Sequence, residues 1–480
     1  MLDSMHLSEV FTFFSYFLLL VLVVTISYHK QKTDTDFIIG NRSLNFWLTA
    51  LSAHGSDMSQ WLFMAYPALI FATGIFNIWL AIGLVFFMFL NWQFVAPRLR
   101  MGTEKTESLT LNTFFEKRFQ DPSGSIRIAS ALLTLLFYAF YISAGLVAFG
   151  FLIKSLFGFS YFIGISFGLF LVVSYVFLGG YVTVAWIDLV QGIFLLAVIL
   201  IIPIYLLIDL GGLTRIYYLM EQKRLATSLL PNLNIKTLFD ILMISCGWGL
   251  GYFGQPHIVT RFMGIKNVKE MNKAKYLGLT WQTLALCGAT LFGLIGILIF
   301  PRGLYNEELI TLEVVKATLP PFFSGLILCA IIAAATNVMA AQILVSASSI
   351  TEDLYKRIFH QKSSEKELLW ASRFSVLFMG LIAFLVAFFQ NSSIYSLVLY
   401  AWSGLGASFG PLLLFSLYWE KVTKSAALAG ILTGGLSAAL WPLIAEWYEI
   451  PIPSMIVGFI LSSLAIYSIT SLSQKEEVRK

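Results

Sequence analysis

The chain has 480 residues, of which 58% are hydrophobic and only 12% are charged. A soluble domain could not bury this much apolar surface, so the composition predicts a protein that crosses a membrane many times. The formal net charge of +5 then fits loops that face anionic lipid, and it does not require a nucleic-acid partner.

Thirteen apolar runs are long enough to span a bilayer, since a spanning helix needs about 20 apolar residues. The first six runs lie near residues 9–28, 45–71, 74–96, 127–153, 159–180 and 182–208. The remaining runs lie near residues 237–259, 275–300, 320–349, 367–391, 394–418, 424–445 and 451–472. The sequence therefore predicts an all-α polytopic membrane protein with about 13 transmembrane helices.

The distribution of basic residues predicts the orientation. Most of the 31 Lys and Arg residues lie in loops that are cytoplasmic if the N-terminus is placed outside. Cytoplasmic loops carry an excess of Lys and Arg in membrane proteins. We therefore expect a multi-pass protein of the cell (inner) membrane, with the N-terminus outside and the C-terminus in the cytoplasm.

The second apolar run contains a polar stretch, Ser52–Trp61, at its middle. A carboxylate at the bilayer centre costs a few kcal/mol and usually marks a ligand or ion pathway. Gly55 and Pro67 both weaken helical hydrogen bonding, so this helix should be interrupted. Polar packing between helices is the alternative interpretation, but Asp57 and His54 exceed what such packing needs.

Three further polar residues stand out along the first half of the chain. Arg42 precedes the interrupted run; it is either a lipid-facing arginine whose charge reaches the interface or part of an inner gate that pairs with a carboxylate. Tyr141 falls near the middle of the fourth run, where it could line a cavity. Asp188 is either a carboxylate at a helix start or a stepping-stone for a cation on its way to the cytoplasm.

A second interruption is predicted at Gly247–Pro256, which holds four glycines and a proline. Trp248 and Tyr252 lie on one helical face there, and Gln255 follows them. Aromatic rings beside an unwound backbone suit a small amphiphilic ligand, because they cover its apolar part and attract an ammonium group. Close packing through glycine is the alternative.

The two interrupted runs cross the membrane in opposite senses, and each begins a set of five runs. Paired interrupted helices of this kind indicate an inverted repeat with a binding site between the halves. We expect a leading helix and first inner loop (1–44), a first repeat (45–208), an outer loop (209–236), a second repeat (237–418), and two trailing helices with a cytoplasmic tail (419–480).

The ninth run contains small and polar residues at its centre, Ala333–Val338. Small residues allow close approach to the Ser52–Trp61 segment, and Thr336 or Asn337 could offer an oxygen to a cation. Sodium is well served by a few oxygens, many of them from backbone carbonyls.

Enzyme chemistry is not expected. The histidines are scattered, and no nucleophile–base pair or metal-ligand cluster emerges from the sequence; they are His6, His29, His54, His257 and His360. We expect no cofactor and no obligate protein partner. A membrane solute sensor that binds without transport is the alternative from another class.

Four motifs, at Ser52–Trp61, Ala185–Gln191, Gly247–Pro256 and Ile350–Tyr355, together resemble the sodium:solute symporter family, and within it the branch that carries proline with sodium. The similarity runs over nearly the whole chain. It implies a LeuT-type fold with a five-plus-five inverted-repeat core. It also implies import of a small zwitterionic amino acid, most of all L-proline, by cation symport with alternating access.

The resemblance also implies roles for individual residues. The substrate pocket would consist of Ser59, Trp61, Tyr141, Trp248 and Tyr252, with the neighbouring Gln60 and Gln255. The sodium site would use Asp57 together with the backbone carbonyls of Gly55, Met58 and Ala334, and with Thr336 or Asn337. Coupling and gating would involve Arg42 and Asp188, and we add His54 to this group because it directly precedes Gly55, not because the family has a histidine there.

Three positions depart from the family pattern. The family has adjacent serine and threonine hydroxyls on the ninth helix, where this chain has Asn337 and Val338. His54 stands in place of a small residue, and Gln60 in place of a glycine. One hypothesis is that sodium binding is weakened or lost and His54 accepts a proton instead, which its reference pKa near 6.5 would suit. A carrier or exchanger that needs no cation is also open. For His54, the alternative to accepting a proton is that it only hydrogen-bonds a backbone carbonyl.

Overall fold

The computed structural model describes residues 7–28, 34–359, 362–389 and 393–479, and the regular elements within these ranges are helices. Three of the five histidines (His6, His29 and His360) lie outside them. The helices of the first half are α1 (Leu7–Tyr28), α2 (Asp34–Ile39), η1 (Gly40–Arg42), α3 (Phe46–Gly55), α4 (Gln60–Phe63), α5 (Ala65–Thr73), η2 (Ile75–Asn77), α6 (Ile78–Leu90), η3 (Asn91–Val95), α7 (Ala96–Lys105), α8 (Leu111–Arg118), α9 (Ser125–Phe157) and α10 (Tyr161–Asp209).

The second half begins with α11, a short helix between the two sets of spans. Its helices are α11 (Gly212–Gln222), α12 (Ile235–Gly249), η4 (Leu250–Gly254), α13 (Pro256–Met263), η5 (Val268–Glu270), α14 (Met271–Ile299), η6 (Glu307–Leu309), α15 (Ile310–Thr318), α16 (Pro321–Ser348), η7 (Ser349–Phe359), α17 (Glu365–Phe389), α18 (Ile394–Tyr418), α19 (Lys424–Trp447) and α20 (Ser454–Arg479). The short helices α8, α11 and α15 lie in loops for which the apolar pattern predicted no helix.

Ten helices in the described ranges are long and apolar enough to cross a membrane. Each of the thirteen predicted runs falls on helical structure. The run near 45–71 is divided among α3, α4 and α5, and the runs near 159–180 and 182–208 are both contained in α10. Within α10, Gly180 has φ 58° and ψ −159°, a backbone conformation that suits glycine and divides the helix in two. The number of crossings, about thirteen, stays a prediction.

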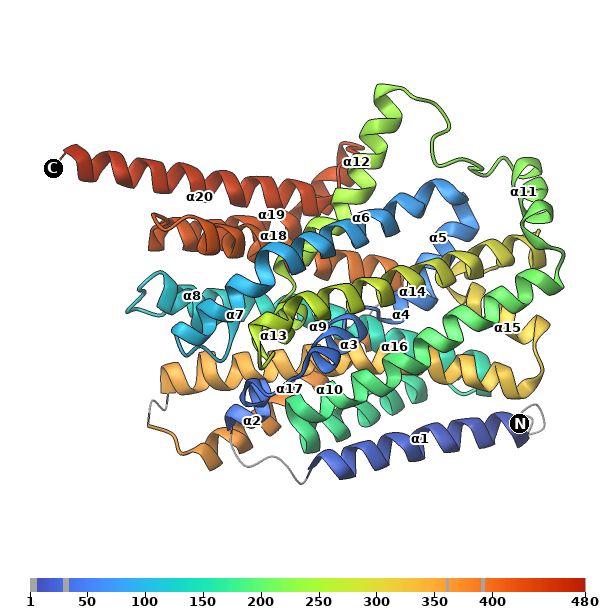
Figure 1. Cartoon of the computed structure of the whole chain (residues 1–480), viewed down its shortest axis with the longest axis horizontal. Coiled ribbons are helices and arrows are strands. Elements are labelled where there is room, and N and C mark those ends of the chain that lie inside the picture. The colour runs from blue at the N-terminus through green and yellow to red at the C-terminus, as the bar shows by residue number, and fades with distance from the viewer. Residues whose placement is uncertain (1–6, 29–33, 360–361, 390–392, 480) are drawn as a thin grey trace.

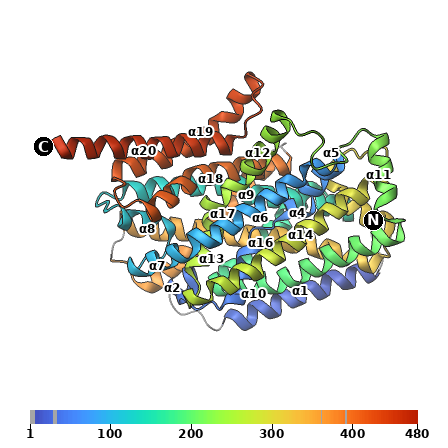
Figure 2. The ribbon, with the colours of Figure 1, turned by 45° about the horizontal axis from the view of Figure 1, so that its top comes forward.

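The helices run roughly alongside one another, and the start of α1 and the end of α20 lie at opposite ends of the bundle (Figure 1). One end, at the left of Figure 1, carries α7, α8 and α2; we call it the α8 end. The other carries α11 and α5; we call it the α11 end. The same division is seen after rotation (Figure 2). The segment α3–α5 runs from the bundle centre towards the α11 end, whereas α12–α13 runs away from it (Figure 1).

The core of the bundle is α16. Its most apolar stretch is 94% buried within the protein, against 33% for α19 and α20. Small side chains at Ala333–Ala335, all fully buried, let neighbouring helices approach it closely. The helices around it present apolar side chains outward, as a protein surrounded by lipid requires.

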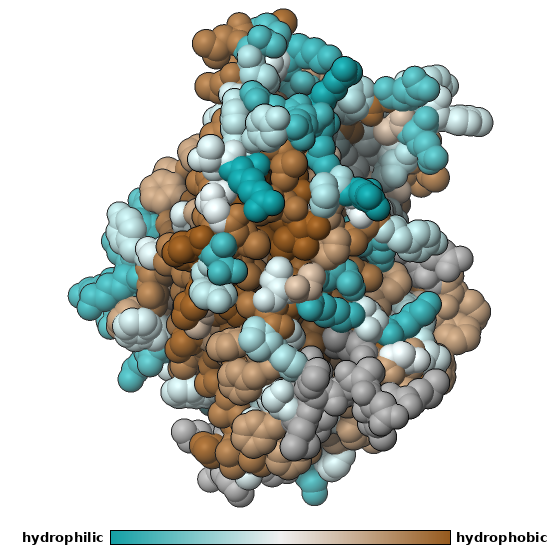
Figure 3. Space-filling model, turned by 90° about the vertical axis from the view of Figure 1, so that its right-hand side faces the viewer, coloured by the Kyte–Doolittle hydropathy of each residue, from teal (hydrophilic) through white to brown (hydrophobic). Residues whose placement is uncertain are grey.

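The segment between α10 and α12 lies against the bundle. The N–H of Ile75 donates to the carbonyl of Ala226 at 2.8 Å, and the Trp79 indole donates to the carbonyl of Leu229 at 2.9 Å. These contacts fasten the segment to the end of α5 and the start of α6. Hydrophilic residues lie among hydrophobic ones on this end of the molecule (Figure 3).

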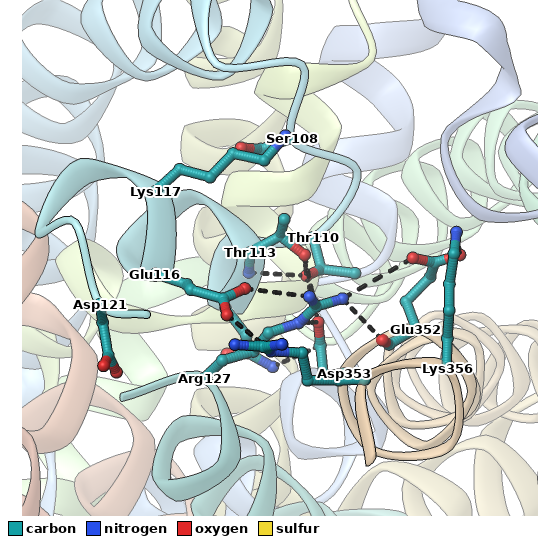
Figure 4. A network of polar contacts seen from close by, with 12 residues as sticks. Ser108, Thr110, Thr113, Glu116, Lys117, Asp121, Arg127, Glu352, Asp353 and Lys356 are labelled. Atoms are coloured by element: carbon teal, nitrogen blue, oxygen red, sulfur yellow. Dashed lines mark hydrogen bonds and ion pairs between the residues drawn. The ribbon is translucent and has the colours of Figure 1, made fainter. Parts of the chain in front are cut away.

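At the α8 end, an ion-pair network joins α8, α9 and η7 (Figure 4). The guanidinium of Arg127 contacts Asp353 at 2.7 Å and Glu116 at 3.0 Å. Asp353 also accepts hydrogen bonds from Asn112 at 2.8 Å and Thr110 at 2.9 Å. Because these groups come from three elements, the network holds α8 against the end of α16.

Candidate functional site

The first interrupted helix breaks directly after Gly55. The N–H of Ser56 turns back to the carbonyl of Ser52 at 3.0 Å, and the N–H of Met58 to that of His54 at 3.0 Å. The helix resumes at α4, where the Ser59 hydroxyl accepts the N–H of Trp61 at 3.4 Å. A serine in this N-cap position satisfies one of the free amides of the new helix. The predicted interruption is confirmed.

The second interrupted helix breaks at η4, between α12 and α13. Pro256 occupies the first turn of α13, where its missing N–H costs nothing. Gly251 lies so close to Trp402 of α18 that a side chain would overlap the indole. The second predicted interruption is also confirmed, and its glycines admit α18 to the break. Both readings of Gly247–Pro256, an unwound backbone and close packing through glycine, therefore apply.

The two breaks meet at Asp57. This carboxylate is fully buried, and its Oδ2 accepts a hydrogen bond from the Tyr252 hydroxyl at 2.5 Å. The Gln282 amide of α14 donates to the same hydroxyl at 2.8 Å. Among the described residues, no cationic side chain pairs with Asp57, and its Oδ1 has no partner. A buried carboxylate without a counter-ion is costly, so this arrangement favours binding of a cation.

Aromatic side chains pack against one another close to Asp57. We call this cluster the aromatic wall; it consists of Trp61, Trp248, Tyr252, Tyr395 and Trp402. The ring of Trp248 lies 5.9 Å from that of Trp61, 6.3 Å from that of Trp402 and 5.6 Å from that of Tyr395. Tyr252 meets Trp402 edge-on at 5.2 Å. The Trp402 indole also donates to the carbonyl of Trp248 at 2.8 Å, which fixes this wall in place.

Access from the α11 end stops at this aromatic wall. Two open cavities of about 680 and 330 Å³ both reach Tyr395, and the smaller is also lined by Trp248. Trp248 is only 6% exposed and Trp61 4%. The site is therefore closed in this conformation, with Trp248 and Tyr395 between it and the cavities.

Polar groups that could hold a zwitterion are buried near the wall. Gln60, on the first turn of α4, has no hydrogen-bond partner for either amide atom among the described residues. Gln255 donates to the carbonyl of Trp402 at 3.0 Å, but its Oε1 is likewise unpaired in the described part of the chain. Tyr141 of α9 is buried and packs edge-on against His257 at 5.9 Å. Each unpaired buried group costs about 1–3 kcal/mol, which a polar ligand would recover.

The two candidate ligands on α16 differ in their environment. The Thr336 hydroxyl donates to the carbonyl of Ile332 at 2.9 Å, and the carbonyl of Thr336 accepts the hydroxyl of Tyr175 at 2.7 Å. Asn337 is fully buried, and neither atom of its amide has a partner among the described residues. Of the two, Asn337 has the side-chain oxygen without any partner among the described residues, although the Thr336 hydroxyl also keeps acceptor lone pairs. Ala334 lies one turn earlier on this buried helix.

Asp188 takes part in a buried ion pair. Its Oδ2 accepts from Arg261 of α13 at 3.0 Å and from the Ser52 hydroxyl at 2.7 Å. Arg261 is 2% exposed and lies over the ring of Tyr181 at 4.7 Å. Gly55 packs against the backbone of Asp188; a side chain there would lie 3.2 Å from the Asp188 carbonyl. Asp188 thus connects α10 with both interrupted helices, a role that neither sequence interpretation included.

Arg42 joins three segments at the α8 end. Its guanidinium donates to the carbonyls of Met263 at 2.8 Å, Ser108 at 2.9 Å and Thr103 at 3.0 Å. No carboxylate pairs with it in the described ranges. Of the two interpretations of Arg42, the gate contact with a carboxylate is not formed here, because backbone carbonyls already satisfy the guanidinium.

His54 faces away from the aromatic wall, towards η3 and α14. Its Nε2 accepts the indole N–H of Trp92 at 3.1 Å, and the two rings stack at 6.1 Å. An accepting nitrogen carries no proton, so this geometry describes a neutral imidazole. The partner is an indole and not the backbone carbonyl that the sequence suggested.

Gly278 of α14 provides the room for His54, because a side chain at this position would overlap the imidazole. We expect Gly278→Ala to lower the free energy of unfolding by about 1–3 kcal/mol, as overpacking in a filled core does. Thermal unfolding of the purified protein measures this. Gly192→Ala is the matched control, since the nearest atoms to an added methyl there are 3.9 Å away. Equal midpoints for the two variants would contradict the prediction.

Three contributors to the site escaped the sequence interpretation: Gln282, Trp402 and Arg261. The sequence did carry a signal for Arg261. It is a lone charge in the apolar stretch after Pro256, and because an unpaired charge is not tolerated in a membrane, a buried partner could have been expected. For Gln282 and Trp402 the sequence carried no comparable signal, since both lie on long spans whose rotation is set by packing.

Similarity to known proteins extends over nearly the whole chain. The family model of the sodium:solute symporter family matches residues 37–434. The chain is 38% identical to the high-affinity proline transporter PutP of Bacillus subtilis, covering 95% of this chain and 96% of the relative. It is also 38% identical to the sodium/proline symporter of Escherichia coli K12, covering 95% and 91%.

Solved structures share the fold at low sequence identity. A Na⁺-coupled sialic acid symporter in a substrate-bound outward-open state superimposes with a TM-score of 0.82 at 18% identity, covering 97% of this chain and 98% of the other. MhsT in complex with L-phenylalanine gives 0.56 at 15% identity, covering 89% and 98%. The fold is thus the LeuT-type fold of sodium-coupled symporters. With the family model spanning most of its length and relatives above one-third identity, the chain belongs to the sodium:solute symporter family.

Proposed function

We propose that this protein is a secondary transporter that imports L-proline together with sodium. The observation that carries the proposal is Asp57: a buried carboxylate without a counter-ion, held by Tyr252 at the meeting point of two interrupted helices. A sodium ion would supply the missing charge. The aromatic wall beside it would cover the apolar ring of the amino acid.

The relatives support both the ion and the substrate. Proteins named sodium/proline symporters are similar to this chain over more than nine-tenths of its length. The ring of proline suits the enclosure by Trp61, Trp248 and Tyr252. The unpaired amides of Gln60 and Gln255 would meet its charged groups, with Ser59 and Tyr141 completing the pocket.

Sodium would bind on the far side of Asp57, against α16. The backbone carbonyls of Gly55, Met58 and Ala334 and the amide oxygen of Asn337 would contribute ligands. Because Val338 offers no side-chain oxygen, the amide of Asn337 replaces the hydroxyl pair of the family. The buried, unpaired state of this amide supports the assignment.

We expect Asn337→Leu, which keeps the approximate volume but removes the oxygen, to raise the sodium concentration for half-maximal uptake at least tenfold. A lost ligand to a charged group costs roughly 1.5–3 kcal/mol, and 1.4 kcal/mol corresponds to a factor of ten. Uptake of labelled L-proline measured over a range of sodium concentrations gives the value. Asn77→Leu, at the α11 end of the bundle, is the control. An unchanged sodium dependence in Asn337→Leu would remove this residue from the site.

Transport would follow an alternating-access cycle. Bound sodium would order the backbone around Gly55 and Met58 and would thereby raise the affinity for substrate. By reciprocity, bound substrate would raise the affinity for sodium by the same factor. One charge that moves down 100 mV releases about 2.3 kcal/mol, enough for roughly 50-fold accumulation. One sodium ion per proline would therefore suffice.

We also infer that residues 45–208 and 237–418 form the two inverted repeats, with the α8 end in the cytoplasm. The opposite directions of α3–α5 and α12–α13 support the repeat, and the Lys and Arg content of the loops supports the orientation.

The test is uptake of labelled L-proline into proteoliposomes that contain the purified protein. We expect uptake in a sodium gradient, little uptake when choline replaces sodium, and a flat dependence on pH from 5.5 to 8. Uptake that needs a proton gradient but not sodium would contradict sodium coupling and return His54 to consideration. Binding of proline without any accumulation would instead indicate a sensor.

A further inference from the structure

A small enclosed cavity lies between the proposed substrate site and the α8 end. Its volume is about 20 Å³, which is room for about one water molecule. Residues of α8, α9, α13 and α16 line it, and the polar ones that matter below are Asn112, His257, Arg261, Ser348 and Ser349. The ring of Tyr141, a residue of the proposed substrate pocket, lies 5.9 Å from that of His257.

His257 presents a hydrogen-bond donor that has no partner. The Tyr138 hydroxyl accepts the backbone N–H of His257 at 2.9 Å, and it lies 3.1 Å from Nδ1 of the same residue. We assign the hydroxyl proton of Tyr138 to Nδ1, the acceptor within its reach, and this assignment places the imidazole proton on Nε2. His257 is fully buried, and its Nε2 has no partner among the described residues.

Arg261 provides a second free donor on the same wall. One terminal nitrogen of the guanidinium, Nη2, is bound to Asp188 at 3.0 Å. The other, Nη1, is buried and has no partner in the described part of the chain. Two unpaired donors on one helix, four residues apart, are an expensive arrangement unless a ligand uses them.

The unpaired donors of the cavity favour an anion. Arg261 is the one formally charged residue that lines it in the described ranges. The carboxylate of Asp188 binds Arg261. The carboxylate of Asp353 binds Arg127 at 2.7 Å (Figure 4) and accepts a hydrogen bond from Asn112 at 2.8 Å. The lining therefore combines two unpaired donors with the hydroxyl of Ser349, whereas the Ser348 hydroxyl already donates to the carbonyl of Leu344 at 2.8 Å. A carboxylate, which accepts up to four hydrogen bonds, matches this set.

We propose that this cavity is an exit subsite that receives the carboxylate of the amino acid as it leaves the central site. The assignment of the ligand as an amino acid rests on the proposed function; the carboxylate specificity rests on His257 and Arg261. The present volume has room for about one water molecule. The proposal therefore requires α13 to separate from α8 and α16 before the subsite can accept a carboxylate. The departing substrate would then exchange the polar groups of the central site for these donors.

Alkylation of a cysteine at Ser348 tests the subsite directly. The cysteine is introduced into the full chain after Cys246→Ser, Cys287→Ser and Cys329→Ala, and membranes are treated with N-ethylmaleimide. Sodium acetate, used as a carboxylate probe, should slow the alkylation of Ser348→Cys at least threefold relative to an equal concentration of acetamide in sodium chloride. Ser408→Cys is the matched control site. Both serines are buried and donate to a carbonyl one turn back, at 2.8 and 2.7 Å, but Ser408 does not line the cavity.

Two variants of His257 connect the effect to the proposed donor. His257→Leu removes the donor and should abolish protection by acetate, whereas His257→Gln retains an N–H and should preserve it. Equal alkylation rates in acetate and acetamide for the Ser348→Cys protein overturn the proposal, whether or not the His257 variants insert correctly. Equal slowing at Ser408→Cys also overturns it, since a general salt effect would then explain the result.

The readout does not require transport, so the two proposals fail separately. Protection by acetate in a protein that takes up no proline leaves the subsite in place and refutes the proposed function. Proline uptake without protection by acetate leaves the proposed function in place and refutes the subsite. With both intact, His257→Leu should raise the KM for L-proline from the α8 side about tenfold while leaving the KM from the α11 side within twofold.

Discussion

Asp57→Asn is expected to reduce sodium-driven uptake of L-proline at least 100-fold. The amide keeps the size of the carboxylate and can still accept the hydrogen bond from Tyr252, but it removes the charge that would bind sodium. Loss of one partner of a buried ion pair costs roughly 3–5 kcal/mol, which corresponds to a factor of 100 or more. The initial rate of uptake of labelled proline into proteoliposomes measures the effect.

Asp240→Asn is the matched control for this experiment. Asp240 lies on α12, the helix that leads into the second break, but it lines the open cavity at the α11 end. It should retain uptake within about twofold, as surface substitutions away from special features do. An Asp57→Asn protein that is folded, inserted and still transports at a comparable rate would separate Asp57 from the cation and remove the main support for the proposed function.

Arg261→Leu is expected to have the largest effect on stability. It leaves the carboxylate of Asp188 buried with only the hydrogen bond from Ser52, which should lower the free energy of unfolding by about 3–5 kcal/mol. Thermal unfolding of the purified protein in detergent reports the loss. Arg215→Leu, on the exposed face of α11, should leave the midpoint nearly unchanged.

The double variant Asp188→Asn with Arg261→Leu identifies the cause. Removing both charges should recover a large part of the lost stability, because replacement of a whole buried ion pair is far less costly than removal of one partner. A double variant as unstable as Arg261→Leu alone would show that the arginine acts through packing against Tyr181 and not through its charge. Neither result depends on which substrate the protein carries.

Prediction from the sequence succeeded where the signal was local. Apolar length located the spans, and the boundaries of α18, 394–418, agree with the structure. The run Ser52–Trp61 predicted a broken helix because its glycine and polar side chains weaken helical hydrogen bonding wherever they occur. The same reasoning found the break at Gly247–Pro256.

Prediction from the sequence was incomplete where rotation of a helix decides the contact. Thr336 and Asn337 are adjacent, and either could have faced a cation. The Thr336 hydroxyl donates to the carbonyl of Ile332 on its own helix, whereas the amide of Asn337 has no partner among the described residues. Likewise, the sequence left open whether His54 accepts a proton or hydrogen-bonds a backbone carbonyl, and in the structure it stacks on Trp92. One residue along a helix is a rotation of about 100°, since a turn takes 3.6 residues, and only neighbouring helices fix that rotation.

The sequence by itself determined that the chain spans a membrane many times, that two of its helices are interrupted, and that a carboxylate lies at one of the breaks. These features depend on local hydrophobicity and on backbone hydrogen bonding, which each segment carries wherever it lies. Only the tertiary structure decided the partners: Tyr252 for Asp57, Arg261 for Asp188, and carbonyls instead of a carboxylate for Arg42. Residues that are 195 positions apart in the chain meet because packing around α16 brings their helices together, and no local pattern encodes that meeting.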